Sequence, residues 1–182
     1  MISTTLGRIR AAEPCTDGWR LLLRALGEGG HPNLARAVTL EEVLEHNGVE
    51  DALWVAHHVC DLTAEGERVL RLFASDVAER ALRAEREAGR EPDGALWAAV
   101  EAARAYARGE IGAEELWDAR DAAWGAADVA ACAAAWAAAW VAAAQDAAQD
   151  AAQDAAQDAA EDVERDWQAE CLLRYLRGEV GR

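Results

Sequence analysis

The feature that most constrains this chain is an alanine-rich stretch that contains neither glycine nor proline from Ala126 to Arg177. Alanine has the highest intrinsic helix propensity, and glycine and proline are the residues that commonly end helices. The sequence therefore predicts one long helix from Gly112 to Arg177, with an expected kink near Gly125, the one glycine in its interior. As a straight rod this helix would be about 100 Å long.

Within this stretch the residues Gln-Asp-Ala-Ala repeat without interruption from Gln145 onward. Four residues turn about 400° on an α-helix, so each repeat is rotated by about 40° relative to the one before it. Asp150, Asp154 and Asp158 therefore follow a right-handed spiral with a rise of about 6 Å between neighbours. A heptad coiled coil needs an apolar face that stays on one side of the helix. The tetrads therefore predict either a partner that follows a right-handed path around the helix or a solvated spacer.

Two tryptophans, Trp136 and Trp140, precede the tetrads and share a helix face with Val129 and Cys132, because the four residues follow one another at spacings of three and four. We interpret this face as part of a packed core, with an aromatic binding strip as the alternative. The candidate partner-binding residues are these two tryptophans and three aspartates of the spiral: Trp136, Trp140, Asp150, Asp154 and Asp158.

A second apolar stripe lies near the C-terminus and consists of Trp167, Leu172, Tyr175 and Leu176. A stripe of this kind needs another surface to cover it. On a straight rod it would lie far from the N-terminal residues. It then packs on a second copy of the chain, or, if the helix bends back, on the chain's own core. We favour the second copy, which makes these four residues the candidate self-association site and a homo-oligomer the expected form.

The first 111 residues predict a bundle of short helices, because apolar side chains recur at spacings of three and four between glycines and prolines. Thr39 and Glu42 have the pattern of a capping box, in which each side chain accepts a hydrogen bond from the other residue's backbone N–H. With the long helix this gives about six helices and no strand. The fold class is all-α, with an N-terminal helical domain in residues 1–111 and the long acidic helix with its stripe in residues 112–182.

The chain is strongly acidic: its 182 residues include 34 Asp and Glu against 18 Arg and no Lys, which gives a net charge of −16. Surfaces that bind nucleic acid directly are basic, so this composition argues against direct binding of nucleic acid. An acidic surface of this size favours a basic protein partner, or serves solubility.

Signals for a membrane or for export are weak. The most apolar window, residues 129–144, is mainly alanine, and it is shorter than the about 20 apolar residues that a membrane span needs. The N-terminus lacks the basic start and apolar run of a secretory signal, so we expect a cytoplasmic protein without membrane contact.

The residues that could carry chemistry are scattered. His57, His58 and Cys60, with His46 upstream, form the only cluster of metal-ligand types. Adjacent side chains on a helix point about 100° apart, so the two histidines do not readily share one ion. We expect a buried His57, an exposed His58 and no metal site.

Other catalytic patterns are also missing from the sequence. The cysteines stand far apart, without the spacing of a zinc ribbon or a disulfide scaffold. The carboxylates predict a solvated face rather than a catalytic pair, and no phosphate-binding glycine loop or nucleophile motif occurs. We therefore expect a protein that is not an enzyme and that uses no cofactor.

Several blocks of the sequence resemble a known family. They are Arg8-Ile9-Arg10, Cys15-Thr16-Asp17-Gly18-Trp19, Glu45-His46-Asn47-Gly48-Val49-Glu50-Asp51-Ala52-Leu53-Trp54, residues 72–80, residues 102–110 and the alanine-tryptophan-aspartate repeats. With these blocks the chain resembles the immunity protein family, alanine- and tryptophan-rich chains of actinobacteria and their phages. The Gln-Asp tetrads stand where that family carries repeats punctuated by arginine and tryptophan.

The resemblance implies a non-enzymatic protein that binds and neutralises a bacterial toxin, with no catalytic residues to transfer. Two alternatives stay open. The first is a structural protein that self-assembles through the long helix and its stripe. The second is an acidic mimic of DNA, in which the aspartate spiral occupies the groove of a nucleic-acid-binding enzyme, although the spiral has a smaller radius than a duplex phosphate path.

Overall fold

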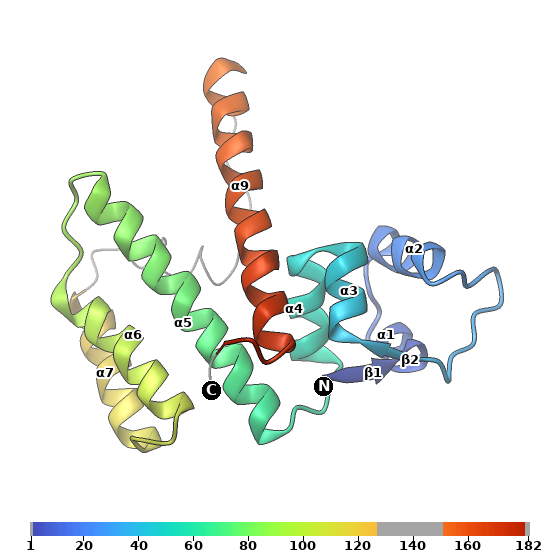
Figure 1. The fold of residues 1–182 in the computed structure, drawn as a ribbon, viewed down its shortest axis with the longest axis horizontal. Helices are drawn as coiled ribbons and strands as arrows, with labels where there is room; N and C mark the ends of the chain where they lie inside the picture. Colours follow the sequence, from blue (N-terminus) through green and yellow to red (C-terminus); the bar gives the residue numbers. More distant parts are fainter. Residues whose placement is uncertain (1, 127–150, 181–182) are drawn as a thin grey trace. The chain divides into compact units, whose positions relative to one another are not determined.

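The computed structural model describes residues 2–126 and 151–180, and the side chains of residues 2–123 and 161–180. These residues are mostly helical (Figure 1), which confirms the all-α class. They group into two compact units: residues 2–66 with 151–180 form the first unit, and residues 67–126 form the second unit. This division differs from the predicted boundary after residue 111, because the C-terminal residues group with the N-terminal ones.

The first unit is organised around α3. In chain order its elements are β1 (Ser3–Thr5), α1 (Leu6–Ala11), α2 (Thr16–Ala25), β2 (Ala37–Thr39), α3 (Leu40–Asn47), α4 (Val49–His58) and α9 (Ala151–Leu176). The two strands lie side by side and antiparallel, with Ser3 opposite Thr39 (Figure 1). Helix α3 contacts α2, α4 and α9. Its position explains why the apolar side chains Leu40, Val43 and Leu44 are buried.

The sequence also explains where α3 begins. Thr39 Oγ1 accepts a hydrogen bond from the Glu42 backbone N–H at 3.1 Å, and Glu42 Oε2 accepts one from the Thr39 backbone N–H at 2.7 Å. The predicted capping box is thus confirmed, and two N–H groups that a helix start leaves without partners are satisfied.

The second unit is a set of three helices. They are α5 (Ala64–Glu87), which begins at the end of the first unit, α6 (Gly94–Ala107) and α7 (Ala113–Ala126). Leu82 of α5 packs with Leu96 and Val100 of α6 and Ala123 of α7 in one buried cluster. Because alanine buries little area, the leucines and valines supply most of the apolar burial in this cluster.

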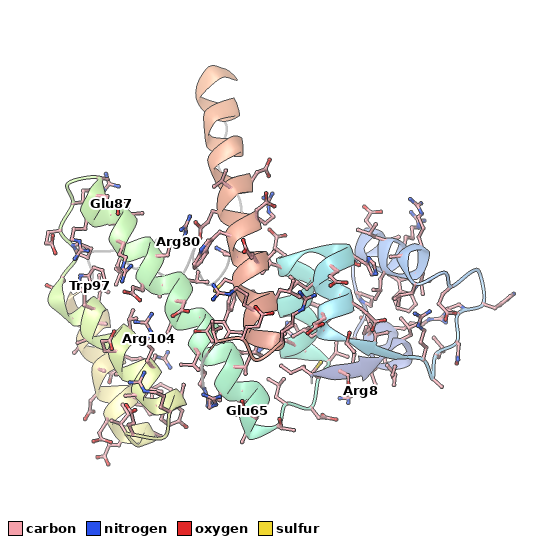
Figure 2. All side chains as sticks on the ribbon, in the orientation of Figure 1. Arg8, Glu65, Arg80, Glu87, Trp97 and Arg104 are labelled. Carbon is pink, nitrogen blue, oxygen red and sulfur yellow. The ribbon has the colours of Figure 1, made fainter. Side chains whose placement is uncertain are left out.

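An ion-pair network joins α5 to α6. The Arg104 guanidinium on α6 (labelled in Figure 2) donates to Asp76 Oδ1 at 2.7 Å and to Glu79, both on α5. Burial acts to lower the Arg104 pKa, but the hydrogen bonds to the two carboxylates outweigh that effect and raise it. The Glu79 pKa is held below its ordinary value, first by the hydrogen bond from Arg104. Arg104 therefore fixes these two helices electrostatically.

Three short elements of the first unit were absent from the sequence-based prediction. We predicted no strand, whereas the chain forms β1, β2 and, before α2, the short helix α1. Each strand has three residues, so no alternation of apolar and polar residues is long enough to reveal it. Helix α1 contains Gly7, whose N–H donates to the Leu34 carbonyl at 2.8 Å. A Cβ on Gly7 would lie 3.0 Å from that oxygen, so this glycine permits a close backbone approach.

The predicted long helix is described only at its two ends. Helix α7 continues through Gly125, where we expected a kink, to Ala126, and α9 begins at Ala151. Residues 127–150 lie outside the described part of the chain. The two ends belong to different compact units.

The C-terminal stripe is covered by the chain's own first unit, which corrects our preference for a second copy. Helix α9 contacts α3 and α4, Leu172 is 0% exposed and Tyr175 is 5% exposed. Trp167 and Leu176 are half-buried. In the predicted straight rod this stripe lies far from the N-terminal residues, but in the tertiary structure it packs on them. A contact with a second copy through Leu172 would require α9 to leave this position. Formation of a homo-oligomer stays a prediction.

Candidate binding cleft

A cleft of about 220 Å³ lies in the first unit between α2, α3 and α4. Its apolar wall consists of Ile9, Pro14, Trp19, Leu22, Val43, Trp54 and Val55. Its polar residues are Cys15, Asn47, Glu50 and Asp51, with Gly18 at the start of α2. Ligand pockets for drug-sized molecules measure about 300–1,000 Å³. The cleft is therefore of a size for a single side chain or a similarly small group.

The start of α2 forms one side of the cleft. Cys15 caps this helix, with its Sγ accepting a hydrogen bond from the Gly18 backbone N–H at 3.2 Å. A Cβ on Gly18 would lie 2.5 Å from Asp51 Oδ2 and 3.0 Å from Cys15 Sγ. A Cβ atom would not fit within 2.5 Å of that oxygen, so glycine at this position leaves room for the Asp51 carboxylate beside the Cys15 cap.

Asp51 is one of the two carboxylates that line the cleft. Asn47 Nδ2 donates to Asp51 Oδ2 at 2.7 Å and to the Gly18 carbonyl at 2.8 Å. Asp51 Oδ1 accepts no hydrogen bond, and Asp51 makes no ion pair, among the residues that the structure describes. One oxygen of Asp51 is thus held in place while the other can accept a donor from outside.

The Asn47 amide is itself incompletely bonded. Its Oδ1 is buried and has no hydrogen-bond partner within the described residues. An acceptor without a partner costs free energy, commonly about 1–3 kcal/mol when it is buried. The Asn47 amide nitrogen nevertheless bridges the Gly18 carbonyl and the Asp51 carboxylate.

Two half-buried indoles, Trp19 and Trp54, provide the aromatic surface of the cleft. The Trp54 ring centroid lies 5.4 Å from that of His58, with the planes tilted by 38°. Glu50 lies at the edge with its side chain 51% exposed, and its Oε1 is 3.8 Å from Arg165 Nε. Neither arginine nor histidine is among the described residues that line the cleft. The cleft therefore combines aromatic faces with unbalanced negative charge.

None of the predicted partner-binding residues is among the described residues that line this cleft. Trp136, Trp140 and Asp150 lie outside the described residues. Asp154 and Asp158 belong to α9, of which only the backbone is described there. Their role as a partner contact therefore stays a prediction.

The histidine cluster differs in part from our expectation. His57 is exposed, so its predicted burial was wrong, whereas His58 is exposed as expected. Their ring centroids lie 4.7 Å apart with nearly perpendicular planes. Burial raises the pKa of the Cys60 thiol, which keeps it protonated at neutral pH and disfavours metal binding. Within the described ranges, no group of three or more His, Cys, Asp or Glu side chains is placed to hold a metal ion.

No described helix is both long enough and apolar enough to cross a membrane. The chain matches no protein-family model, no curated protein and no solved structure in the comparisons with known proteins.

We did not identify this cleft as a site from the sequence. The segments Cys15–Trp19 and Glu45–Trp54, quoted above for a family resemblance, provide most of the polar residues and both tryptophans of the cleft. The available signal was the pairing of a tryptophan with nearby acidic residues in each segment. The contact between α2 and α4 depends on tertiary packing, so spacing along the chain does not reveal it.

Proposed function

We propose that this chain is a binding protein without a reaction of its own, which neutralises a basic protein, such as a toxin, by direct contact in the cytoplasm. The resemblance to the immunity protein family implies the neutralisation of a toxin, and the acidic composition favours a basic partner. The observation that carries the proposal is the concentration of acidic residues beside the aromatic cleft. Helices α3 and α4 carry Glu41, Glu42, Glu45, Glu50 and Asp51 and no arginine. Arginines of other elements pair with four of these carboxylates, whereas Asp51 makes no ion pair within the described residues.

The charge of the whole chain supports the same proposal. With 34 acidic residues against 18 arginines, the carboxylates cannot all be neutralised by one-to-one pairing within the chain. Proteins that act on nucleic acids carry basic surfaces. Opposite charge would accelerate the encounter with such a protein and would make the association rate sensitive to salt.

The decisive experiment is co-expression with the reading frame next to this one. The neighbour alone should arrest growth, and this chain should restore it. A neighbour that is harmless when expressed alone would argue against the proposal. For a purified pair, the association rate should fall as the salt concentration rises. A rate that does not change with salt would exclude electrostatic steering.

The aspartate spiral is a second candidate contact with the same partner. Replacement of Asp150, Asp154 and Asp158 by asparagine removes three charges and keeps the side-chain shape. If the spiral binds the partner, this variant should inhibit less well and show a weaker dependence on salt. Unchanged inhibition at both low and high salt would identify the tetrads as a spacer.

A further inference from the structure

We propose that the cleft between α2 and α4 is a binding site for one arginine side chain of the basic partner. The partner's identity as a basic protein rests on the proposed function, whereas the chemistry of the site rests on the cleft alone. The inference thus assigns Trp19, Trp54 and Asp51 a direct role in recognition.

The volume of the cleft supports a single side chain. At about 220 Å³ the cleft is smaller than the pockets that enclose cofactors and drug-sized ligands. The apolar wall suits a chain of methylene groups, and the carboxylates of Glu50 and Asp51 line the same cleft. A long side chain with a charged tip has this distribution of apolar and polar atoms.

The carboxylates of Asp51 and Glu50 determine that the ligand carries a positive charge. Asp51 has one oxygen held by Asn47 Nδ2 at 2.7 Å, while its second oxygen has no donor among the described residues. Glu50 is 3.8 Å from its arginine partner, with a half-exposed side chain, so its charge is only weakly compensated. A cationic donor would complete the hydrogen bonding of Asp51 Oδ1, whereas an anion would be repelled.

The aromatic surface favours arginine over lysine. A guanidinium group is planar, is weakly hydrated and stacks on an indole face, whereas an ammonium group is compact and strongly hydrated. The chain already uses this pairing elsewhere: the Arg86 guanidinium carbon lies 5.2 Å from the centroid of the Trp97 ring, and that of Arg120 lies 4.6 Å from the Trp117 ring. Trp19, Trp54 and Asp51 line the same cleft, so one guanidinium could stack on an indole and donate to the carboxylate.

The preorganisation of the cleft supports a site rather than a packing gap. Gly18 allows the close approach of α2 to Asp51, and the Asn47 amide bridges the Gly18 carbonyl and Asp51 at the expense of a buried acceptor without a partner. A carboxylate that is held in position before binding loses little conformational freedom when the ligand arrives.

The test uses the full chain and small probes, so it does not depend on finding the partner. The indole N–H resonances of the tryptophans are followed by NMR during titration with N-acetyl-arginine amide, N-acetyl-lysine amide and N-acetyl-citrulline amide. Substitution of Trp19 or Trp54 by phenylalanine assigns the two signals. The arginine probe should shift both signals in a saturable manner, with a dissociation constant of about a millimolar. The citrulline probe, which has nearly the same shape and no charge, should not.

Two variants distinguish the effect of a charge in the cleft from the effect of a charge elsewhere on the protein. Asp51→Asn keeps the shape and removes the charge, and should weaken the arginine probe about tenfold. Asp118→Asn removes one charge from an exposed position of α7 and should leave the affinity unchanged. Thermal unfolding of both variants confirms that they are folded. If Asp51→Asn unfolds the protein, Trp54→Leu is titrated instead. This substitution should weaken binding of the arginine probe to a similar extent.

Several outcomes would overturn the inference. They are the absence of a saturable shift of the two indoles, equal binding of the arginine and lysine probes, and equal affinities for wild type and Asp51→Asn. If the arginine probe does not bind but co-expression still protects cells, the cleft is not the site and the proposed function stands. If the probe binds without protection in co-expression, the cleft stands and the proposed function fails.

Discussion

Arg177 Nη2 donates to Glu45 Oε1 at 3.1 Å, although 132 residues separate the two along the chain. The same guanidinium also lies 3.8 Å from Glu41 of α3. These pairs stand at the C-terminal end of α9, where a positive charge also interacts favourably with the helix dipole. Both pairs are partly exposed, so their contribution to stability is small. The buried apolar residues of α9, Leu172 and Tyr175, therefore provide most of the stability of its contact with α3 and α4.

Leu172→Ala should destabilise the first unit by about 2–5 kcal/mol, because it removes buried methyl groups and leaves a cavity. Denaturant unfolding followed by circular dichroism measures the change. Val163→Ala on the same helix is the matched control, since Val163 is 63% exposed and its truncation should cost little. Equal effects of the two substitutions would show that α9 is not docked on α3 and α4.

Arg104→Ala should destabilise the second unit by about 1–3 kcal/mol, because it leaves two partly buried carboxylates without their shared donor. The matched control is Arg83→Ala. Arg83 also contacts Glu79, but its side chain is 60% exposed, compared with 16% for Arg104, so its loss should cost much less. Thermal or denaturant unfolding of both variants gives the comparison. A larger loss for Arg83→Ala would contradict the assigned network.

The contribution of this network should depend on pH. The Glu79 pKa is lowered in the folded state, first by the Arg104 hydrogen bond. A lowered carboxylate pKa stabilises the folded state above the unfolded-state pKa of about 4.3, and this contribution is lost as the pH falls through the folded-state pKa. The difference in unfolding free energy between wild type and Arg104→Ala should therefore be larger at neutral pH than in acid below both pKa values. An increase of this free-energy difference on acidification would contradict the predicted direction of the pH dependence.

Thr39→Ala should destabilise the start of α3 by about 1 kcal/mol, because the helix loses its N-terminal cap. Hydrogen exchange provides the local readout: the Glu42 N–H, which donates to Thr39 Oγ1, should exchange faster in the variant. Thr16→Ala is the control, since Thr16 is an exposed residue in the first turn of α2 and does not cap its helix. Unchanged exchange at Glu42 would mean that the capping bond does not persist in solution.

The sequence by itself determined the local features of this protein. Alanine content, Thr39 with Glu42, and glycines such as Gly27 and Gly109 act over one or two helical turns, so the helix type and most helix ends could be predicted without tertiary information. The acidic character followed from composition alone. The small strands escaped prediction because their pairing joins Ser3 to Thr39, and their three-residue length leaves no periodic signal.

Only the tertiary structure decided which surfaces meet. The amphipathic pattern of Leu172 and Tyr175 required a covering surface, but a pattern of residues does not say whether that surface belongs to the same chain or to another. Packing on α3 and α4 settled this for the described residues. The cleft has the same origin, since Gly18 and Asp51 approach each other through the contact of α2 with the α3–α4 pair. Contacts between residues far apart in sequence depend on the sum of many weak packing terms, which no local pattern records.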